Sequence, residues 1–399
     1  MISLEEALAA VRARCSVLPA ESVPLAEAAG RVLSEPVVAR RDQPGTDISM
    51  MDGYALRAGD AASPLRVIGE VAAGDKPWTA PLQPGEAARI FTGAPVPSGA
   101  DCVVMQEQCA REGAEVRVRE EPRAGQHIRR RGEELRAGVA ALAAGTLLNP
   151  AELSLAAACG ASSVRVPRRP RVAFLATGDE LVPVGTEPAE GQITETNSLS
   201  LLSLARALGA EPRFLGTAPD DVAQIAARLQ AADADLLVTT GGASVGDHDH
   251  AQEALERIGG ALVFHTVAIR PGKPILFGTA GERRLLFGLP GNPAAATLGF
   301  ELFVSLALRI LAGLPERPLL RARLAAPLGQ VRGLTFFPRG ALAARGAVLE
   351  FTPGRQQSSM QIASWAQVNA VAQVPPGEGR LEPGAEVEVL LLGPLHPAP

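Results

Sequence analysis

The spacing of apolar and polar residues changes along the chain and divides it into segments with different expected structures. Near the N-terminus, LEEALAAVRAR at residues 4–14 and VPLAEAAGRVL at residues 23–33 have apolar residues at helical spacing, which predicts helices. Between residues 44 and 138 the apolar runs become short and are separated by proline and glycine, which predicts a small β-rich domain. Helical spacing returns in PAELSLAAACG at residues 150–160, so the β-rich segment is expected to interrupt a helical region.

Strand and helix patterns alternate between residues 169 and 315. The runs RVAFLAT, EPRFLGT, LLVTT and LVFHTVAI predict strands, and the amphipathic segments between them predict helices. This alternation is typical of a doubly wound, mostly parallel sheet that carries its ligand loops along one edge. Residues 316–399 again contain short strand patterns, which predict a β-barrel or a β-sandwich.

The predicted fold class is therefore multidomain α/β plus β. The expected domains are a helical N-terminal region (residues 1–43 and 139–168), an inserted β-rich domain (44–138), a doubly wound α/β domain (169–315) and a C-terminal β domain (316–399). A chain of 399 residues exceeds the size of one typical hydrophobic core, which also favours several domains.

Composition argues against several functional classes. The net charge of −5 gives no electrostatic footprint for nucleic acid or for an anionic membrane surface. The N-terminus combines acidic residues with helical spacing, which indicates a helix and not a signal peptide. The long apolar stretch at residues 294–313 is interrupted by Glu301 and Arg309, so we expect a buried helix and no membrane span. The four cysteines form no C-x-x-C pair, which favours a cytoplasmic protein without zinc or disulfides.

Three loop motifs follow strand patterns in the α/β segment: TTGGASVGDHD at residues 239–249, RPGKP at 270–274 and GLPGNPAAAT at 288–297. Glycine lets the backbone approach a ligand closely, and a helix after the loop would offer free N–H groups to an anion. The first motif would cradle a phosphate through backbone N–H groups. These groups belong to Gly241, Gly242, Ser244 and Gly246. Asp247 and Asp249 follow, and carboxylates beside a phosphate favour a divalent cation.

Further candidate residues lie where other strand patterns end. ATGDEL leaves Asp179 and Glu180 at the ligand edge, where a glutamate would bind an amino-pyrimidine ring edge or a metal. APDD supplies Asp220 and Asp221, of which one is expected to cap the next helix and the other to be available for chemistry. Arginine has replaced lysine almost everywhere in this chain, so the retention of Lys273 in RPGKP favours a compact charge beside phosphate.

The β-rich segment contributes two polar loops and an arginine cluster. Asp52 lies in the turn of TDISMMDGYALRAGD, and Thr92 follows the strand pattern of RIFTGAPVPSGADC. The motif IRRRGEELRAG gathers three arginines beside Glu134, and a solvated hairpin edge is an equally good interpretation of it. Nothing in the chain matches a Ser/His/Asp or Cys/His nucleophile arrangement. A transition-metal site at His248 and His250 is disfavoured, because no third histidine lies nearby in the sequence.

The motifs DISMMDGYA, FTGAPVPSGAD, IRRRGEE, TGDEL, TGGASVGDHD, RPGKP and LPGNP follow one another along essentially the whole chain. In this order they resemble the molybdopterin molybdenumtransferase family, called MoeA in bacteria and represented by the gephyrin E domain in animals. The resemblance implies a helical region, an inserted β domain, a molybdopterin-binding α/β domain and a C-terminal β-barrel. It also implies a homodimer whose active cleft lies between the α/β domain of one subunit and the inserted domain of the other.

The reaction implied by the resemblance takes adenylylated molybdopterin and molybdate, inserts molybdenum into the dithiolene and releases AMP, assisted by a divalent cation such as Mg²⁺. Asp52 and Thr92 are implied as cleft residues that come from the partner subunit. Four functional carboxylates are implied, the last three of them as metal ligands: Glu134, Glu180, Asp220 and Asp249. Anion contacts and loop-shaping residues are implied at Gly178, Arg270, Lys273, Pro290, Gly291, Asn292 and Pro293.

Three features depart from the family pattern. Glu134 is a longer carboxylate at a position where aspartate is common. Thr266 stands where family members often have lysine, which would weaken oxyanion binding unless Arg270 compensates. In the C-terminal segment GRQQSSMQIASW the usual glycine–serine turn is loose, so no catalytic residue is predicted there.

Two other functions remain open at the level of the sequence. A molybdopterin adenylyltransferase would use the same α/β domain with ATP, but it typically lacks the segments that carry Asp52 and Thr92. We expect that enzyme instead as the upstream partner. A cofactor-carrying scaffold would bind molybdopterin without turnover, although the chain has no long linker for a partner. The sequence does not distinguish molybdate from tungstate, since both are tetrahedral dianions of similar size.

Overall fold

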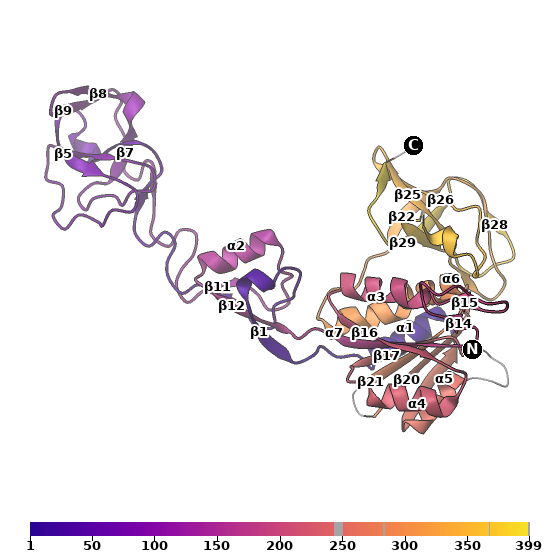
Figure 1. Ribbon diagram of the computed structural model, residues 1–399. Coiled ribbons are helices and arrows are strands. Elements are labelled where there is room, and N and C mark those ends of the chain that lie inside the picture. The colour runs from indigo at the N-terminus through magenta and orange to yellow at the C-terminus, as the bar shows by residue number, and fades with distance from the viewer. Residues whose placement is uncertain (243–249, 282–283, 367, 398–399) are drawn as a thin grey trace. The chain divides into compact units, whose positions relative to one another are not determined.

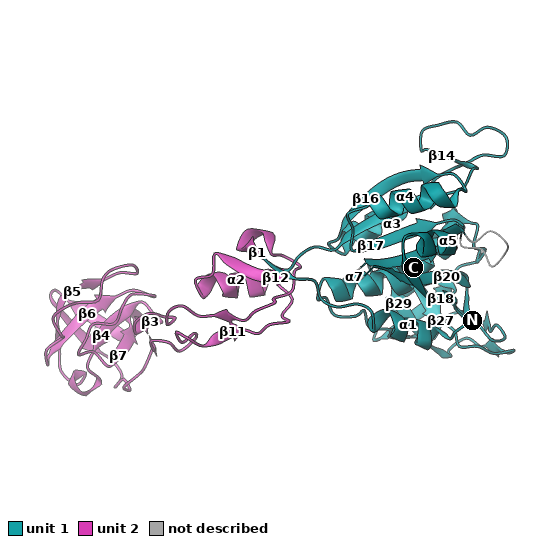
Figure 2. Ribbon diagram, turned by 90° about the horizontal axis from the view of Figure 1, so that it is seen from below, with its two compact units in different colours: residues 1–21, 167–399 teal, residues 22–166 magenta. Residues whose placement is uncertain are grey.

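The computed structural model describes residues 1–242, 250–281, 284–366 and 368–397. The chain divides into two units, one of residues 1–21 with 167–399 and the other of residues 22–166 (Figure 2). The first unit contains an α/β domain and a C-terminal β domain (Figure 1). The second contains a small helical part and a β-rich sheet.

A six-stranded sheet forms the centre of the α/β domain, with strand order β16-β13-β17-β21-β20-β18. Its strands are β13 (Arg171–Thr177), β16 (Glu211–Ala218), β17 (Leu236–Thr240), β18 (Gly260–Thr266), β20 (Pro274–Ala280) and β21 (Arg284–Leu289). The pairs β13–β16, β13–β17 and β17–β21 are parallel, which confirms the predicted sheet, whereas β20–β21 and β18–β20 are antiparallel. The connection of residues 281–283 is too short for a parallel crossover, so β20 and β21 form a hairpin.

Helices cover both faces of this sheet (Figure 1). One face carries α3 (Asn197–Ala207), α6 (Pro293–Gly299) and α7 (Ser305–Leu311), and the other carries α4 (Val222–Ala231) and α5 (His250–Arg257). The side chains of β13 alternate between the two cores, as the two-residue repeat of a strand requires. Val172 and Phe174 pack into the first core, and Ala173 and Leu175 into the second.

The helical stretch Pro293–Leu311 is long and apolar enough to cross a membrane by length and composition. It includes α6, a π-helical turn (Phe300–Val304) and α7. However, 78% of its apolar window is buried inside the protein, as expected for a helix of the α/β core.

The N-terminal helix α1 (Leu4–Arg12) packs in the α/β core and not with residues 139–168, where the sequence had placed it. Its buried stripe consists of Leu4, Ala7 and Val11, and a capping box of Ser3 and Glu6 fixes its first turn. Helical spacing shows that one face of a helix is buried, but it does not identify the surface that covers this face. The grouping by sequence neighbourhood was therefore wrong for this helix.

In the second unit, the helix expected at residues 23–33 is absent. The chain forms β1 (Ala20–Pro24), a 3-10 turn (Leu25–Glu27) and a left-handed turn at Gly30, and Val32 then bridges to Leu147. Proline and glycine break the helix, and the apolar residues are buried instead against α2 (Pro150–Ala158). Short strand pairs complete this part: β1 with β12 (Ser163–Pro167), β2 (Val37–Val38) with β11 (Ala140–Leu142), and β3 (Ile48–Ser49) with β10 (Ile128–Arg129).

The β-rich part of the second unit is a six-stranded mixed sheet with strand order β7-β4-β6-β5-β9-β8. Its strands are β4 (Gly53–Leu56), β5 (Leu65–Val71), β6 (Glu86–Ile90), β7 (Cys102–Met105), β8 (Cys109–Glu112) and β9 (Glu115–Val118), with 3-10 turns at Ala58–Asp60 and Gln106–Gln108. Two apolar clusters are built on its strands, one containing Leu56 and Val104, the other Val71 and Ile90.

The C-terminal domain is a closed barrel, as predicted. The strand order β26-β22-β29-β27-β25 is completed by a further pairing between β25 and β26. Its strands are β22 (Leu320–Leu324), β25 (Arg339–Arg345), β26 (Val348–Pro353), β27 (Ala370–Gln373) and β29 (Glu386–Leu391), and β30 (His396–Pro397) adds to β25. Outside the barrel lie β23 (Leu328–Gly329), β28 (Arg380–Leu381) and a 3-10 turn (Ile362–Trp365). A parallel pair of β19 (Ile269–Arg270) and β24 (Thr335–Phe336) joins this domain to the α/β domain.

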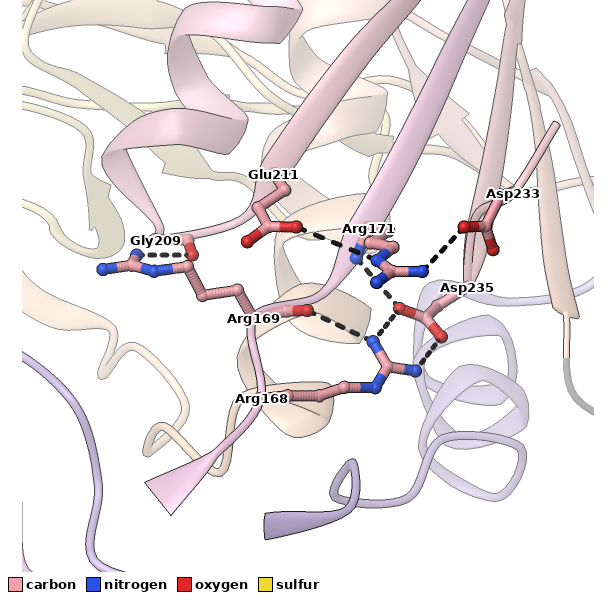
Figure 3. Close-up of polar contacts among 7 residues, drawn as sticks. All are labelled: Arg168, Arg169, Arg171, Gly209, Glu211, Asp233 and Asp235. Carbon is pink, nitrogen blue, oxygen red and sulfur yellow. Dashed lines mark hydrogen bonds and ion pairs between the residues drawn. The ribbon is translucent and has the colours of Figure 1, made fainter. Parts of the chain in front are cut away.

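A cluster of arginines and carboxylates ties together the starts of the parallel strands (Figure 3). Arg168 donates to both carboxylate oxygens of Asp235, at 2.7 and 2.5 Å, and the backbone N–H of Arg171 donates to the same carboxylate at 2.9 Å. Burial alone would raise the pKa of Asp235, but the bonds and charges of these two arginines outweigh it and hold the pKa below its ordinary value. This edge of the sheet lies opposite the carboxyl ends of the strands, so the cluster fixes the scaffold and not the candidate site.

Candidate functional site

A cavity of about 640 Å³ opens at the carboxyl ends of β13, β16, β17 and β21. Each of these strands contributes the loop that follows it, because parallel strands end at one edge of a sheet. Nine residues singled out from the sequence line this cavity: Gly178, Glu180, Asp220, Gly241, Gly242, Pro290, Gly291, Asn292 and Pro293. The glycine loop, the carboxylates and the proline loop therefore meet in one place.

Close backbone approach explains the glycine at position 241. Its φ is 89°, and a Cβ atom there would lie 2.3 Å from the carbonyl oxygen of Thr177. No side chain fits at that distance without moving β13. Gly242 also has a positive φ of 64°, so the backbone of both residues turns at the cavity wall.

The two aspartates of APDD divide their roles as expected. Asp221 accepts the backbone N–H groups of Ala223 and Gln224 at 2.7 and 3.0 Å and caps α4. Bonds from Gln224, and then from Ala223, lower the pKa of Asp221. Asp220 instead lines the cavity, where one carboxylate oxygen lies 3.6 Å from Nδ1 of His250.

The sequence analysis did not predict one wall of the cavity. Residues 193–197 follow β14 (Leu181–Val182) and include β15 (Ile193–Thr194), and they lead into α3. Asn197 donates from Nδ2 to the carbonyl of Gly291 at 2.8 Å, and buried Glu195 accepts the backbone N–H of Ser198 at 2.9 Å. The sequence signal was a polar ETNS run before a helix, which resembles an ordinary helix start.

A second cavity of about 530 Å³ adjoins the first and shares Pro274, Pro290 and Asn292 with it. Exposed Arg270 and Lys273 line this second cavity, and neither forms an ion pair with any residue that the structure describes. The guanidinium of Arg270 lies 5.9 Å from the ring centre of Phe336. The cations of RPGKP are thus held beside the first cavity by the parallel β19–β24 pair.

The C-terminal domain also contributes to both cavities. Ser358 and Ser359 line the second, and Met360 lines the first. The loop is held by Arg339, which is only 1% exposed and donates from Nη2 to the carbonyls of Gln356 and Ser358 at 3.3 and 3.0 Å. Burial lowers the pKa of Arg339. The sequence assigned no role to this segment, because its contacts with the α/β domain are tertiary and leave no local pattern.

The start of α6 does not offer the free N–H groups expected after GLPGNPAAAT. The N–H of Ala294 donates to the carbonyl of Ser359 at 3.1 Å, and those of Ala295 and Ala296 donate to the carbonyl of Asn292 at 3.0 and 2.9 Å. Pro293 has no N–H group. RPGKP likewise precedes a strand, β20, and not a helix. The expectation of a helix-end anion site was therefore wrong for these two loops, which contribute shape and side-chain charge.

In the second unit, the structure brings Asp52 and Thr92 together. One carboxylate oxygen of Asp52 accepts both the backbone N–H and the hydroxyl of Thr92, each at 2.8 Å. These two bonds lower the pKa of Asp52, so its carboxylate stays charged at neutral pH. In the same unit, Glu134 accepts a bond from Nη2 of Arg129 at 3.0 Å.

Several expected site residues cannot be placed. Ser244, Gly246, Asp247, His248 and Asp249 lie outside the described residues. Among the residues that are described, no group of three or more histidine, cysteine, aspartate or glutamate side chains is arranged to hold a metal ion. Thr266 is half-buried and pairs with Pro274 in the β18–β20 ladder, directly beside the RPGKP loop.

Three family models together match nearly all of the chain. Residues 2–160 match the model described as the MoeA N-terminal region (domain I and II). Residues 173–310 match a probable molybdopterin binding domain, and residues 321–392 match the MoeA C-terminal region (domain IV).

Similar proteins include two molybdopterin molybdenumtransferases. That of Nostoc sp. is 38% identical over 387 residues, which cover 93% of this chain and 88% of the relative. That of Synechococcus elongatus is 38% identical over 403 residues, covering 98% of this chain and 99% of the relative. Among solved structures, a molybdopterin biosynthesis MoeA protein from Pyrococcus horikosii is similar with a TM-score of 0.85 and 32% identity. It covers 99% of this chain and 100% of its own.

Proposed function

This chain belongs to the MoeA family, and from that premise we propose that it inserts molybdenum from molybdate into adenylylated molybdopterin and releases AMP. It is accordingly a molybdopterin molybdenumtransferase of molybdenum cofactor biosynthesis. The observation that carries the detailed proposal is the pair of adjoining cavities. One is lined by backbone turns and carboxylates, and the other by two cations that have no ion-pair partner among the described residues.

The first cavity suits the organic substrate. Its volume of about 640 Å³ lies in the range of small-molecule sites. The turns at Gly241 and Gly242 bring backbone groups to the wall, where they would contact the phosphoanhydride. Asn197 supplies a polar group at the same wall for the edge of the pterin ring.

The second cavity suits the oxyanion. Arg270 and Lys273 are its positive charges, and the hydroxyls of Ser358 and Ser359 are hydrogen-bond donors for oxygen atoms. Because the two cavities share Pro274, Pro290 and Asn292, an oxyanion bound here would lie next to the organic substrate. The same cations would stabilise the negative charge that develops when the phosphoanhydride P–O bond breaks and AMP departs.

A divalent cation such as Mg²⁺ fits the donor set of the first cavity. Glu180 and Asp220 both line it, and carboxylate oxygens are the ligands that hard cations prefer. We propose Asp249, which lies outside the described residues, as the third protein ligand. When bound, the cation would neutralise charge on the phosphoanhydride.

We further propose that the protein acts as a cytoplasmic homodimer and receives its substrate from a molybdopterin adenylyltransferase. In this proposal Asp52 and Thr92 reach the cleft from the partner subunit. Their mutual hydrogen bonds, and the lowered pKa of Asp52, support a role for this pair as a fixed negative charge.

The function is tested by incubating the purified protein with adenylylated molybdopterin and either molybdate or tungstate, then quantifying AMP and metal-loaded cofactor. We expect AMP release that depends on the oxyanion. Consumption of ATP without oxyanion dependence would instead identify an adenylyltransferase, and tight binding of molybdopterin without turnover would identify a scaffold.

The carboxylate assignments are tested with Glu180→Gln, Asp220→Asn and Asp249→Asn in the same assay. Each should reduce molybdate-dependent AMP release and raise the Mg²⁺ concentration needed for half-maximal rate. Glu187→Gln is the matched control, because Glu187 is exposed in the loop after β14 and does not line the cavity. A wild-type rate in Asp249→Asn would refute its role as a ligand.

A further inference from the structure

A third cavity, of about 130 Å³, lies in the first unit where α1, the α6–α7 stretch and the C-terminal barrel meet. It shares no lining residue with the two cavities of the candidate site. The apolar part of its wall is formed by Leu4, Leu8, Leu302, Leu306, Leu319 and Leu390, and the other lining residues are polar or charged. The two cavities of the candidate site each have a single leucine in their lining, Leu181 in the first and Leu334 in the second.

Two ion pairs neutralise four of the charged side chains at this cavity. Arg12 donates from Nε and Nη2 to the two carboxylate oxygens of Glu316, each at 2.8 Å. Arg317 donates from Nη2 to the carboxylate of buried Glu301 at 2.6 Å. These pairs leave no net charge on the four residues.

Arg309 is the remaining charge, and it has no carboxylate partner among the residues that the structure describes. Its Nε donates to the backbone carbonyl of Pro315 at 2.6 Å, which leaves both Nη groups available. Burial, and then the neighbouring charge of Arg317, lower the pKa of Arg309. A guanidinium nevertheless stays protonated in proteins, so the wall carries one uncompensated positive charge in partly apolar surroundings.

The geometry of the wall is fixed by specific contacts. The π-helical turn Phe300–Val304 lies at the cavity, and such turns are frequent at functional sites. Nη2 of Arg317 also donates to the backbone carbonyl of Glu301 at 2.7 Å and to Oγ of Ser305 at 2.8 Å. One arginine therefore satisfies the groups that the turn exposes, and it leaves the neighbouring Arg309 as the group able to bind a ligand.

We propose that this cavity binds a short-chain monocarboxylate, with its carboxylate on Arg309 and its alkyl chain against the leucines. The cavity volume of about 130 Å³ is well below that of either cavity of the candidate site, which favours an acid of a few carbon atoms over a pterin or a nucleotide. One negative charge matches the one uncompensated arginine, and a planar carboxylate matches the guanidinium fork. A tetrahedral oxyanion would satisfy the charge but would leave the leucine wall without an apolar partner.

A ligand in this position would contact segments that are far apart in sequence. The wall includes α1, the π-helical turn, the linker after α7 and the barrel residues Gln373 and Leu390. Binding would therefore stabilise the docking of the barrel on the α/β domain, because a ligand that binds only the folded arrangement favours it.

The test is calorimetric titration of the purified full-length protein with sodium butyrate, supported by its thermal unfolding temperature. We expect saturable binding with a Kd on the order of 1 mM and a rise in Tm. Arg309→Gln keeps a donor for the Pro315 carbonyl but removes the charge, and should weaken binding at least about tenfold. Arg14→Gln is the matched control and should bind as wild type, because Arg14 is exposed, bonds to the backbone carbonyl of Ala10 at 3.2 Å and lies outside the cavity.

Two further probes test the same site in the wild-type protein, so the result does not depend on the folding of Arg309→Gln. In the wild-type protein, 1-butanol has the same alkyl chain without the charge and should bind at least about tenfold more weakly than butyrate. Inorganic phosphate should not compete. Equal binding of butyrate and butanol, stronger binding of phosphate, no saturable binding of butyrate, or unchanged affinity in folded Arg309→Gln would each overturn the proposal.

Discussion

Breaking the ion pair between Arg168 and Asp235 should destabilise the α/β sheet, and the loss of stability can be measured at the edge where the pair lies. In Asp235→Asn, the charged partner of Arg168 disappears while the volume of the side chain is retained. Asp235 loses its two charged bonds with Arg168, and its bond from the N–H of Arg171 becomes a weaker neutral one. Arg168 then remains partly buried without its paired carboxylate, with only the weaker charges of Asp233 and Glu21 acting on it, a condition that costs free energy in the folded state.

The size of the loss follows from the exposure of the two side chains. Removing one partner of a fully buried pair costs about 3–5 kcal/mol, and an exposed pair contributes at most about 1 kcal/mol. The side chains of Arg168 and Asp235 are 31% and 16% exposed, between these limits. We therefore expect Asp235→Asn to destabilise the domain by about 2–3 kcal/mol, which corresponds to a factor of about 30–150 in an opening equilibrium.

The pH dependence has a definite sign. The folded-state pKa of Asp235 is depressed below its ordinary value, so its contribution to stability is fully present above the unfolded pKa of about 3.9. That contribution is lost as the pH falls through the lower folded-state pKa. The stability difference between wild type and Asp235→Asn should therefore be constant at neutral pH and should shrink below about pH 4.

Hydrogen exchange of the β13 and β17 amides is the appropriate assay, because it reports the opening of this sheet without requiring two-state unfolding of the whole chain. Asp233→Asn is the matched control, since Asp233 pairs with Arg171 at 2.7 Å but is 83% exposed. Exchange should accelerate strongly in Asp235→Asn and little in Asp233→Asn. Equal acceleration in the two variants would refute the argument that burial decides the strength of these pairs.

Three further predictions concern the candidate site. Gly241→Ala places a Cβ 2.3 Å from the Thr177 carbonyl, so a fluorescence titration should show loss of molybdopterin binding; wild-type affinity would contradict the close approach. Thr92→Val removes one of the bonds that lower the pKa of Asp52, so the acid limb of the pH–rate profile should move to higher pH, and an unmoved limb would separate this pair from catalysis. Arg270→Gln should raise the KM for molybdate about tenfold and also lower kcat, because the same guanidinium would stabilise the charge on the departing AMP; steady-state AMP release measures both, and an unchanged kcat would contradict that second role.

Sequence reasoning succeeded where one local signal has one structural meaning. Glycine and carboxylate residues after successive strand patterns had to meet, because the carboxyl ends of parallel strands share an edge. Asp220 and Asp221 divided between cavity and helix cap because an N-cap position accepts only one of two neighbours. The closure of the C-terminal barrel agreed with its many short strand patterns and with the family resemblance.

It failed where a pattern is compatible with several tertiary partners. The apolar stripe of α1 identified a buried face but not the α/β core that covers it. The apolar residues at 23–33 are buried as expected, yet Pro24 and Gly30 make them part of strands and turns. The loop that ends at Met360 reached the site through contacts with residues more than sixty positions away, such as Asn292 and Ala294. No local spacing rule detects such contacts.

Because of these contacts, an anion in the site would be bound by side-chain cations and not by the N-terminus of α6. Since Ser359 and Asn292 occupy the first N–H groups of α6, the proline loop cannot hold a phosphate through its helix end. Among the described residues, positive charge at the two cavities comes from Arg270 and Lys273, whose positions depend on the β19–β24 pair with the C-terminal domain. The C-terminal domain therefore accepts a hydrogen bond from the start of α6, and it also orients the two cations that would bind the anion in place of the helix end. Incorrect docking of the barrel should therefore weaken oxyanion binding and leave the turn at Gly241 intact. The close approach of Gly241 to Thr177 is formed within the α/β domain alone.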